Sequence, residues 1–485
     1  MSFWPLTSKA PTPLSRLFNL LLMVLCFLCI FFFIASLSIL YISSSSSSSS
    51  LKSLLRPATS LPAISTPTSL DHIVFSIASS ANSWPKRKDY VHLWWKPHQM
   101  RGCVFLDTMP SEKNTSNDKL LPPICISEDT SQFRYTNKYG YRSAIRGARV
   151  VLETVALNHS NVRWFVFGDD DTVFFADNLV KTLSKYDHNL WFYVGSSSES
   201  FEQNSENFFD MAFGGGGFAI SYPLARILAN TMDSCLVRYP HLFGSDSRIF
   251  SCLTELGVGL THEPGFHQVD IRGDAFGLLA AHPLTPLLSL HHFDSVEPIF
   301  PNMTRLQALQ NLFEAVKFDP ARVLQRTVCY DRWYSWTISI SWGYAVQVIE
   351  AYKLLPDLLP VEKTFKPWRI KEKIYSNLYK FTTRELHIDP CNRPTIFFLE
   401  SISFDGKRIK SSYRKVISED CLKRKGPWIL RLEYIRVFSK KMDLDIKQLQ
   451  APRRHCCDVL SSSNRSVMDI GIRECREEEQ IFMHL

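Results

Sequence analysis

The stretch of residues 163–177 constrains the fold more than any other part of the chain, because it reads RWFVFGDDDTVFFAD. Residues 164–167 are aromatic or β-branched, which predicts a buried strand, and Gly168 ends the run. Asp169, Asp170 and Asp171 follow at once. Three like charges at the end of a buried strand are costly unless a cation or solvent offsets them. The sequence therefore predicts a polar site at the carboxyl end of this strand.

The segments around this strand alternate between strand-like and helix-like patterns. The apolar run of residues 70–80 predicts a first strand, 86–95 a helix, 102–107 a second strand and 140–157 a long helix. A further strand is expected at 190–200. This order predicts an α/β domain with a mainly parallel sheet, whose ligands bind at the carboxyl ends of the strands.

From about residue 302 the pattern becomes that of a smaller, β-rich region. Residues 327–349 alternate between apolar and polar, and 393–404 and 456–460 suggest further strands. We expect residues 302–485 to form a disulfide-braced region that packs on the α/β domain of residues 70–301.

The N-terminal part predicts a membrane anchor. Residues 17–42 carry no charge and are long enough to cross a bilayer core of ~30 Å as one helix. Residues 1–16 would form a short cytoplasmic tail, and the Ser- and Pro-rich residues 43–69 a flexible stem. The arrangement predicts a single-pass type II protein whose remaining chain is lumenal.

Cysteine usage agrees with a secretory route. Of the twelve cysteines, Cys26 and Cys29 fall in the apolar run, and the other ten are scattered without a repeated CxxC pattern. This spacing argues against a zinc ribbon and predicts lumenal disulfides. Four glycosylation sequons also occur, at Asn114, Asn158, Asn302 and Asn464. The formal charge of +8 includes no long basic run, which excludes a nucleic-acid surface.

The acidic run has several possible explanations. The EF-hand spacing is absent, and so is a P-loop. A solvated turn, a helix N-cap at Asp171 and an acidic cluster paired with arginines remain as structural explanations. The functional alternative is a divalent ion that bridges carboxylate and diphosphate oxygens after a buried strand.

Residues 211–230 are expected to form a loop that enters a helix at Pro223. The loop holds Gly214, Gly215, Gly216 and Gly217, which remove every side chain where the backbone approaches a ligand or adopts a positive φ. Taken alone, the four glycines favour a plain hairpin or packing turn.

Four motifs in order carry a family resemblance: FVFGDDDTVFF, FGGGGFAIS, GSDSRIF and SLHHFD. Together they resemble the fringe-type glycosyltransferases of family 31. The C-terminal motifs CYDRW, DPCNRP and HCCDVL are similar to the plant fringe-related proteins with a long extra C-terminal region. The resemblance implies a GT-A-like domain that binds a nucleotide-sugar, in a Golgi membrane protein.

The resemblance also implies roles for particular residues. Asp171 and Asp169 would ligate manganese, together with His292 or, as the second choice in the adjacent pair, His291. Asp246 in GSDSRIF would serve as the general base, although its position after Gly-Ser also suits a helix N-cap.

The same resemblance places the donor. Asp169, Asp170 and the four glycines 214–217 would bind a UDP-sugar. His262, Glu263, His267 and Asp270 are further polar candidates, for the acceptor side.

These observations predict a metal-dependent inverting glycosyltransferase. It would move a hexose or N-acetylhexosamine from a UDP-sugar to a hydroxyl of a glycan or glycoprotein, with a β-1,3 linkage implied by the family. A single carboxylate base, on the side of the sugar opposite the leaving group, implies direct displacement and inversion. The alternative is a non-catalytic lumenal lectin or scaffold that kept the fold, and a weaker one is a calcium-dependent adhesion module.

Overall fold

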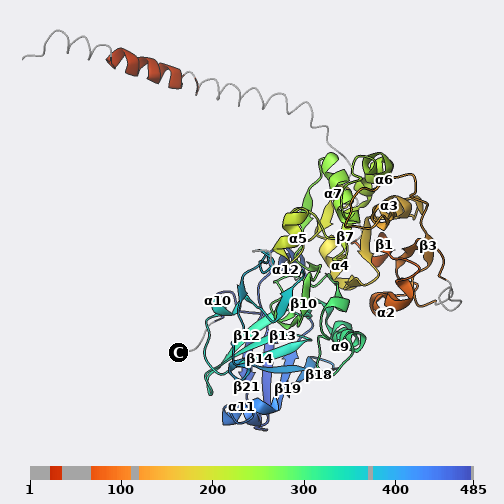
Figure 1. Ribbon diagram of the computed structural model, residues 1–485. Coiled ribbons are helices and arrows are strands. Elements are labelled where there is room, and N and C mark those ends of the chain that lie inside the picture. Colours follow the sequence, from red (N-terminus) through yellow and green to blue (C-terminus); the bar gives the residue numbers. More distant parts are fainter. Residues whose placement is uncertain (1–21, 35, 37–66, 111–118, 370–374, 482–485) are drawn as a thin grey trace, which may run out of the picture. The chain divides into compact units, whose positions relative to one another are not determined.

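The computed structural model of the protein describes residues 22–34, 36, 67–110, 119–369 and 375–481 (Figure 1). The chain divides into two compact units, residues 1–66 and 67–485. In the first unit, residues 22–34 are helical. No helix in the described part of the chain combines the length and apolar character that a membrane crossing needs. The anchor predicted at 17–42 extends beyond the described residues at both ends and stays a prediction.

The second unit contains a seven-stranded sheet that is rich in parallel pairs, as predicted. In order across the sheet the strands are β3 (Ile124–Ile126), β2 (Arg101–Leu106), β1 (Ile73–Ala78), β4 (Trp164–Asp169), β7 (Phe218–Ser221), β6 (Tyr193–Gly195) and β8 (Leu260–His262). Strands β1 to β4 pair in parallel, and so do β6 and β8. Only β7 runs antiparallel to its neighbours among the described strands of this sheet.

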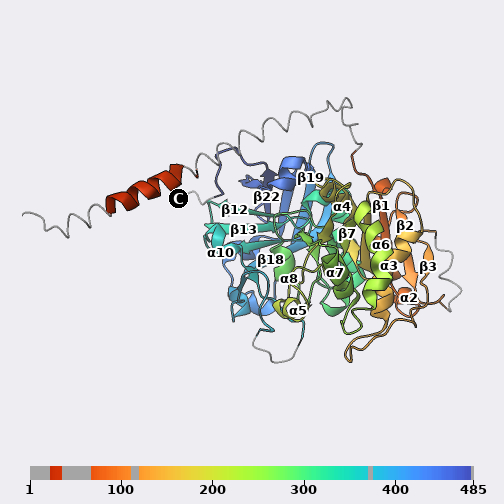
Figure 2. The same ribbon diagram turned by 90° about the horizontal axis from the view of Figure 1, so that it is seen from above.

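The alternation of side chains along these strands separates two cores. On one face, Phe165 and Phe167 of β4 pack with apolar residues of α3 (Ser143–Ala156), α6 (Tyr222–Leu236) and α7 (Ser245–Glu255). On the other face, Trp164 and Val166 belong to a core shared with α2 (Trp84–Trp94) and α4 (Ala176–Leu183). Figure 2 shows α3, α6 and α7 gathered together. Both faces are buried, as a parallel-rich sheet requires.

Strand β7 is a feature that the sequence prediction missed. Residues 211–230 were expected to be a loop that leads into a helix, but residues 218–221 form a fully buried strand between β4 and β6. The short apolar run FAIS gives no periodicity by which a strand can be told from a helix entry. The helix itself begins as predicted, at Tyr222 with Pro223 in its first turn.

The C-terminal region forms a second sheet of eight strands, which confirms that it is rich in β-strands, as predicted. All its neighbouring strands are antiparallel except the parallel pair β20 and β22. In order the strands are β12 (Arg326–Asp331), β13 (Trp336–Ser341), β14 (Ala345–Ile349), β18 (Thr395–Phe404), β19 (Ile409–Val416), β20 (Tyr434–Ser439), β22 (Val467–Arg473) and β21 (Cys456–Leu460).

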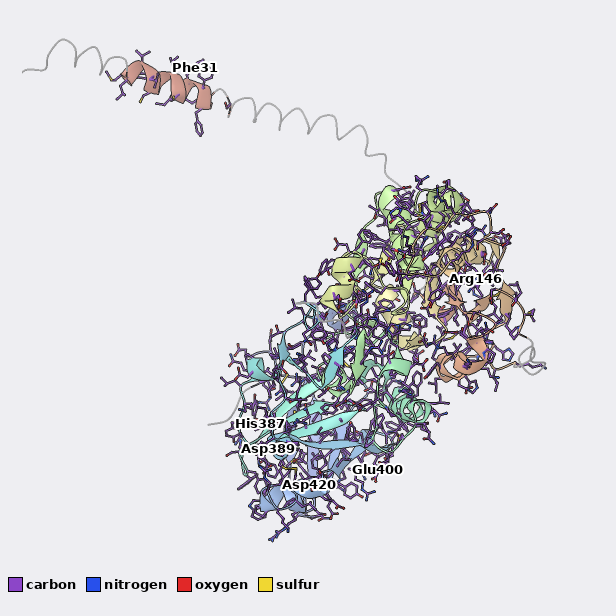
Figure 3. The ribbon with its side chains drawn as sticks, viewed as in Figure 1. Phe31, Arg146, His387, Asp389, Glu400 and Asp420 are labelled. Atoms are coloured by element: carbon purple, nitrogen blue, oxygen red, sulfur yellow. A yellow bond between two sulfur atoms is a disulfide. The ribbon has the colours of Figure 1, made fainter. Side chains whose placement is uncertain are left out.

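Five disulfides confirm the predicted use of the ten cysteines. In the α/β part, one joins β2 to β3 and another joins α6 to α7. Three brace the C-terminal region, and Figure 3 draws Asp389 and Asp420 beside the cysteines of one of them. The pairs are Cys103–Cys125, Cys235–Cys252, Cys329–Cys457, Cys391–Cys421 and Cys456–Cys475.

The two sheets share one continuous core. Apolar residues of α9 (Arg305–Phe318) join the cluster that contains both β1 and the second sheet. Phe313 of α9 stacks on Phe175, which follows β5 (Val173–Phe174), with ring centroids 5.4 Å apart. Residues 67–485 form one compact unit, and the domain boundary predicted between residues 301 and 302 stays a prediction.

Candidate functional site

A small three-stranded sheet brings the acidic run to the histidine pair. Strand β11 (Ser289–Leu290) lies between β5 and β9 (Phe266–His267), and Leu290 faces Val173 of β5. The residue after Leu290 therefore lies next to the residues before Val173. This register places His291 beside the acidic turn, although more than one hundred residues separate them in the sequence.

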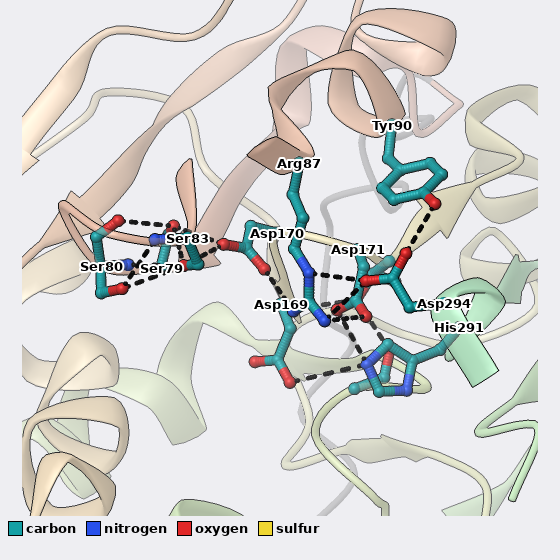
Figure 4. Close-up of polar contacts among 12 residues, drawn as sticks. Ser79, Ser80, Ser83, Arg87, Tyr90, Asp169, Asp170, Asp171, His291 and Asp294 are labelled. Atoms are coloured by element: carbon teal, nitrogen blue, oxygen red, sulfur yellow. Dashed lines mark hydrogen bonds and ion pairs between the residues drawn. The ribbon is translucent and has the colours of Figure 1, made fainter. Parts of the chain in front are cut away.

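His291, Asp169 and Asp171 form a cluster that can hold a metal ion. The Nε2 atom of His291 lies 3.0 Å from Asp171 Oδ1 and 3.8 Å from Asp169 Oδ2. One potential ligand atom from each residue lies within 4.8 Å of the others (Figure 4). Carboxylate oxygens with one imidazole suit Mn²⁺ and similar divalent ions. The side chains present therefore fit the predicted cation.

The other histidine of the pair is placed differently. His292, the first choice from the sequence, has a left-handed backbone with φ of 56°. Its ring lies with Nδ1 3.0 Å from Asp270 Oδ1 and stacks on Trp368 with centroids 4.3 Å apart. The geometry thus places His291, the second choice, in the cluster with the acids.

Arg87 of α2 offsets part of the acidic charge. Its guanidinium group pairs with Asp170 at 3.0 Å, Asp171 at 3.2 Å and Asp294 at 2.9 Å. Tyr90, one turn further along α2, donates a hydrogen bond to Asp294 at 2.9 Å. Figure 4 shows these contacts converging between α2 and the acidic turn. An acidic cluster paired with an arginine, one of the structural explanations, is therefore present alongside the candidate metal cluster.

Asp170 is occupied by internal contacts. Its side chain is 2% exposed and accepts hydrogen bonds from Ser79 Oγ at 2.6 Å and Ser83 Oγ at 2.5 Å, in addition to Arg87. Both serines lie where the chain passes from β1 to α2. The contacts of Asp170 thus tie the end of β4 to this connection and leave little of the carboxylate for a ligand.

The charges of the cluster shift two pKa values in opposite directions. Burial would lower the pKa of His291, but Asp171 and Asp169 outweigh it and raise the value to about 9. Burial would raise the pKa of Asp171, but His291 and Arg87 outweigh it and hold the value well below the usual range. The side chains of His291 and Asp171 therefore form an ion pair at neutral pH.

Asp246 lies in the first turn of α7, beside Gly214 of the glycine loop. Gly244 occupies the N-cap position, so the expectation that Asp246 itself caps this helix is wrong. Its Oδ1 accepts from the Ser247 N–H at 2.9 Å and its Oδ2 from the Gly214 N–H at 3.3 Å. Desolvation raises the pKa of Asp246. A small cavity of about 20 Å³ is lined by both Asp246 and Asp169.

The glycine loop packs directly on the cluster. A Cβ atom on Gly215 would lie 2.0 Å from the ring of His291, which leaves no room for a side chain. The Gly215 carbonyl accepts from Thr172 Oγ1 at 2.7 Å, and the Gly216 N–H donates to Gln268 Oε1 at 2.5 Å. Gly217 has φ of +82°. Close packing thus explains the missing side chains at Gly215 and Gly217, whereas a Cβ on Gly214 would make only an ordinary contact of 3.7 Å with Asp246.

A cleft of about 1010 Å³ opens beside Asp246. Its described lining includes Asp270 and His292, but not the other three polar candidates from the sequence. His262 and His267 line a separate pocket, and Glu263 is 2% exposed and pairs with Lys185. Of that group, the structure therefore places only Asp270 near Asp246.

The most important residue that the sequence prediction missed is Arg87. It lies in KRKDYVHLWW, which was interpreted only as a helix. Asp294 ends the SLHHFD motif, but nothing in the sequence pairs it with Arg87. The available signal was the position of a basic helix directly after the first strand, where it faces the carboxyl ends of the neighbouring strands.

Comparison with known families agrees with this arrangement. A family model described as Fringe-like matches residues 69–328, more than half of the chain. The chain belongs to the fringe-like glycosyltransferase family. A second model, described as a protein of unknown function, DUF604, matches residues 203–457. The fringe-like match contains every residue of the candidate metal cluster as well as Asp246.

The chain was also compared with curated proteins and with solved structures. No match is found among curated proteins. Among solved structures, one match is the mannosyltransferase PcManGT from Pyrobaculum calidifontis in complex with GDP-Man and Mn2+. The match covers 53% of this chain and 74% of the mannosyltransferase chain. The sequence identity is 14% and the TM-score is 0.26.

The pairing of Arg87 generates a prediction about stability. Arg87→Met leaves Asp170, 2% exposed, without its cation and Asp171, 1% exposed, with His291 alone, so we expect the free energy of unfolding in metal-free buffer to fall by about 3–5 kcal/mol. Lys96→Met is the matched control, because Lys96 pairs with the exposed Asp177, and it should cost at most about 1 kcal/mol. Denaturant unfolding measures both. Equal losses in the two variants would contradict the role assigned to Arg87.

Proposed function

We propose that this fringe-like protein is an inverting, metal-dependent glycosyltransferase. It moves a hexose or N-acetylhexosamine from a UDP-sugar to a hydroxyl of a glycan or glycoprotein, forming a β-1,3 linkage. The observation that carries the proposal is the meeting of two carboxylates and an imidazole, able to hold a cation, with a separate carboxylate at a cleft. Family membership supports the same reaction class.

The cluster of Asp169, Asp171 and His291 is proposed to hold Mn²⁺. The bound ion would neutralise the diphosphate charge that develops as the sugar leaves. The protein contributes a donor set that is already assembled: the ion would replace the proton that His291 and Asp171 share in the metal-free protein, and Gly215 packs against the imidazole ring and limits its movement. Asp169 has Asp170 and Asp171 as acidic neighbours, and it is the acid of the three without a contact to Arg87.

Asp246 is proposed to accept the proton of the acceptor hydroxyl. The Gly214 and Ser247 N–H groups fix the orientation of its carboxylate at the cleft. Its raised pKa makes it a better proton acceptor than an ordinary aspartate. In an inverting displacement the hydroxyl attacks the face of the sugar opposite the departing diphosphate, so Asp246 and the metal cluster would lie on opposite sides of the anomeric carbon.

The donor is proposed to lie between these two groups, along the glycine loop. Gly214 connects them, since its N–H holds Asp246 and its neighbour Gly215 packs on His291. The absence of side chains from 214 to 217 lets a sugar approach the backbone closely. Asp170 is assigned a positioning role, because Ser79, Ser83 and Arg87 already occupy its carboxylate.

The first test is calorimetric titration of the full chain, purified in mild detergent, with UDP. We expect binding that requires Mn²⁺ and that Asp171→Ala and His291→Ala reduce at least tenfold. Asp177→Ala removes an exposed carboxylate a few residues away and should leave the affinity unchanged. A folded wild-type protein that binds no UDP with or without Mn²⁺ would favour the lectin or scaffold alternative.

A second prediction separates chemistry from binding. Asp246→Asn keeps the shape of the side chain but removes the base, so transfer should fall by about 10²–10⁴-fold. Binding of UDP with Mn²⁺ should remain, because Asp246 is not part of the metal cluster. The measurement is UDP release from a panel of UDP-sugars with pooled glycan acceptors. Transfer at the wild-type rate by Asp246→Asn would exclude Asp246 as the base.

The proposed location is the Golgi membrane, with residues 17–42 as a type II anchor, 43–69 as a stem and the rest of the chain in the lumen. The support comes from the uncharged run and the sequons. We expect the full chain to stay in the membrane fraction after alkaline carbonate extraction and to carry N-glycans that a glycosidase removes. A variant with a cleavable signal peptide in place of residues 1–42 should be released. Extraction of the full chain by carbonate would contradict the anchor.

A further inference from the structure

The C-terminal region contributes to the wall of the candidate active-site cleft. Strand β16 (Phe365–Pro367) pairs antiparallel with β10 (Ile271–Gly273), with Arg272 opposite Lys366. This pairing carries the next two residues, Trp368 and Arg369, into the described lining of the cleft that also contains Asp246. Residues beyond the fringe-like match, which ends at 328, therefore face the proposed reaction site.

Trp368 is held firmly in this wall. Its ring stacks on His292 with an interplanar angle of 15°, and the Arg272 guanidinium lies 4.8 Å from its centroid. Arg272 Nε also donates to the Trp368 carbonyl at 2.6 Å. Arg369 forms an ion pair with Glu206, the last residue of α5 (Phe201–Glu206). These contacts fix the segment to two different parts of the α/β region.

Helix α5, to which Arg369 is paired, adds amide groups to the lining. Gln203 of α5 is 8% exposed, and its Nε2 atom has no hydrogen-bond partner among the described residues. The neighbouring Asn207 lines the same cleft and donates to the Gln203 carbonyl at 3.0 Å. A buried amide without a partner costs about 1–3 kcal/mol, which a ligand hydroxyl at this position would recover. Side-chain amides beside aromatic rings suit a hydroxyl-rich ligand.

The charges in the described lining disfavour an anionic ligand. Asp246 and Asp270 are both acidic and lie near the proposed transfer site. Of the two arginines in the lining, Arg369 is paired with Glu206, whereas Arg272 contacts the uncharged ring and carbonyl of Trp368. An acidic sugar here would meet two carboxylates, with Arg272 as the one cation of the described lining that is not paired with an acid.

We propose that the cleft binds a neutral oligosaccharide acceptor and that Trp368 of the C-terminal region, together with Gln203, selects it. The inference rests on the proposed function, because it names the acceptor class of the same site. The volume of about 1010 Å³ lies at the upper end of the ~300–1,000 Å³ of ordinary ligand pockets, so the cleft accommodates more than one sugar ring.

The experiment uses the full chain with UDP and Mn²⁺ present, so that no sugar is transferred. Oligosaccharides that end in galactose, N-acetylglucosamine, fucose or mannose are compared with sialylated, sulfated and uronic-acid glycans on one array. We expect binding to neutral glycans only. Gln203→Ala and Trp368→Ala should each weaken the affinity at least tenfold, measured by titration with the best neutral glycan.

Three controls keep the outcomes distinct. Trp333→Ala removes a tryptophan that is 88% exposed and lies outside the described cleft lining, and it should leave glycan affinity unchanged. Trp368→Phe retains a ring that stacks on His292 and should lose less affinity than Trp368→Ala. Titration with UDP and Mn²⁺ reports whether each variant keeps the donor site, as Gln203→Ala is expected to do.

Several results would overturn the inference while the proposed function stands. These are UDP binding with selective binding of acidic glycans, UDP binding without binding of any glycan, and neutral-glycan affinity that neither Gln203→Ala nor Trp368→Ala reduces. Failure of the wild-type protein to bind UDP with Mn²⁺ would instead overturn the proposed function and, with it, this inference.

Discussion

The arrangement of the site depends on one guanidinium group that holds three carboxylates. Arg87 comes from the helix after the first strand, Asp170 and Asp171 from the end of β4, and Asp294 from the turn after the histidine pair. These three segments are far apart in the sequence, and the carboxylates of Asp170, Asp171 and Asp294 repel one another unless a cation lies between them. A buried carboxylate without a partner costs several kcal/mol, so the charge of Arg87 makes their close approach possible. The helix α2 is thus as much a part of the site as the acidic turn.

Steric and electrostatic constraints act on the same few atoms. Arg87 and His291 approach Asp171 from different segments, while the bare backbone of Gly215 packs against the imidazole ring. Movement of the ring toward the loop is blocked, and movement away from Asp171 would break an ion pair that is almost fully buried. A cation that binds here would displace the proton of His291 and be held by side chains that are already in place, and such pre-organisation is the condition for effective electrostatic catalysis.

The sequence predicted the parts of the fold that follow from local patterns. The strand before the acids, the long helix at 143–156 and the entry to α6 at Pro223 were all expected, because their periodicity and helix signals are strong. The β-rich character of the C-terminal region was expected as well. What the sequence left open depends on tertiary pairing. The choice between His291 and His292 requires the register of β11 on β5, and the role of Arg87 requires the packing of α2.

The continuous core also determines what counts as the functional unit. The cluster of buried residues that contains Phe75 of β1 extends to Val346 of β14 in the second sheet. At the junction, a Cβ atom on Gly277 would lie 1.7 Å from the Glu362 carbonyl oxygen, so α8 (Phe276–Ala280) and the segment around Glu362 are in close backbone contact. Such packing does not arise between domains joined only by a linker.

The two family models overlap from 203 to 328, in the part of the chain that makes these contacts. Because β10 lies within this overlap and β16 beyond it, the cleft wall requires both regions to fold against each other. The C-terminal region is therefore best understood as part of the site, since its removal would expose the shared core and withdraw Trp368 from His292 at the same time.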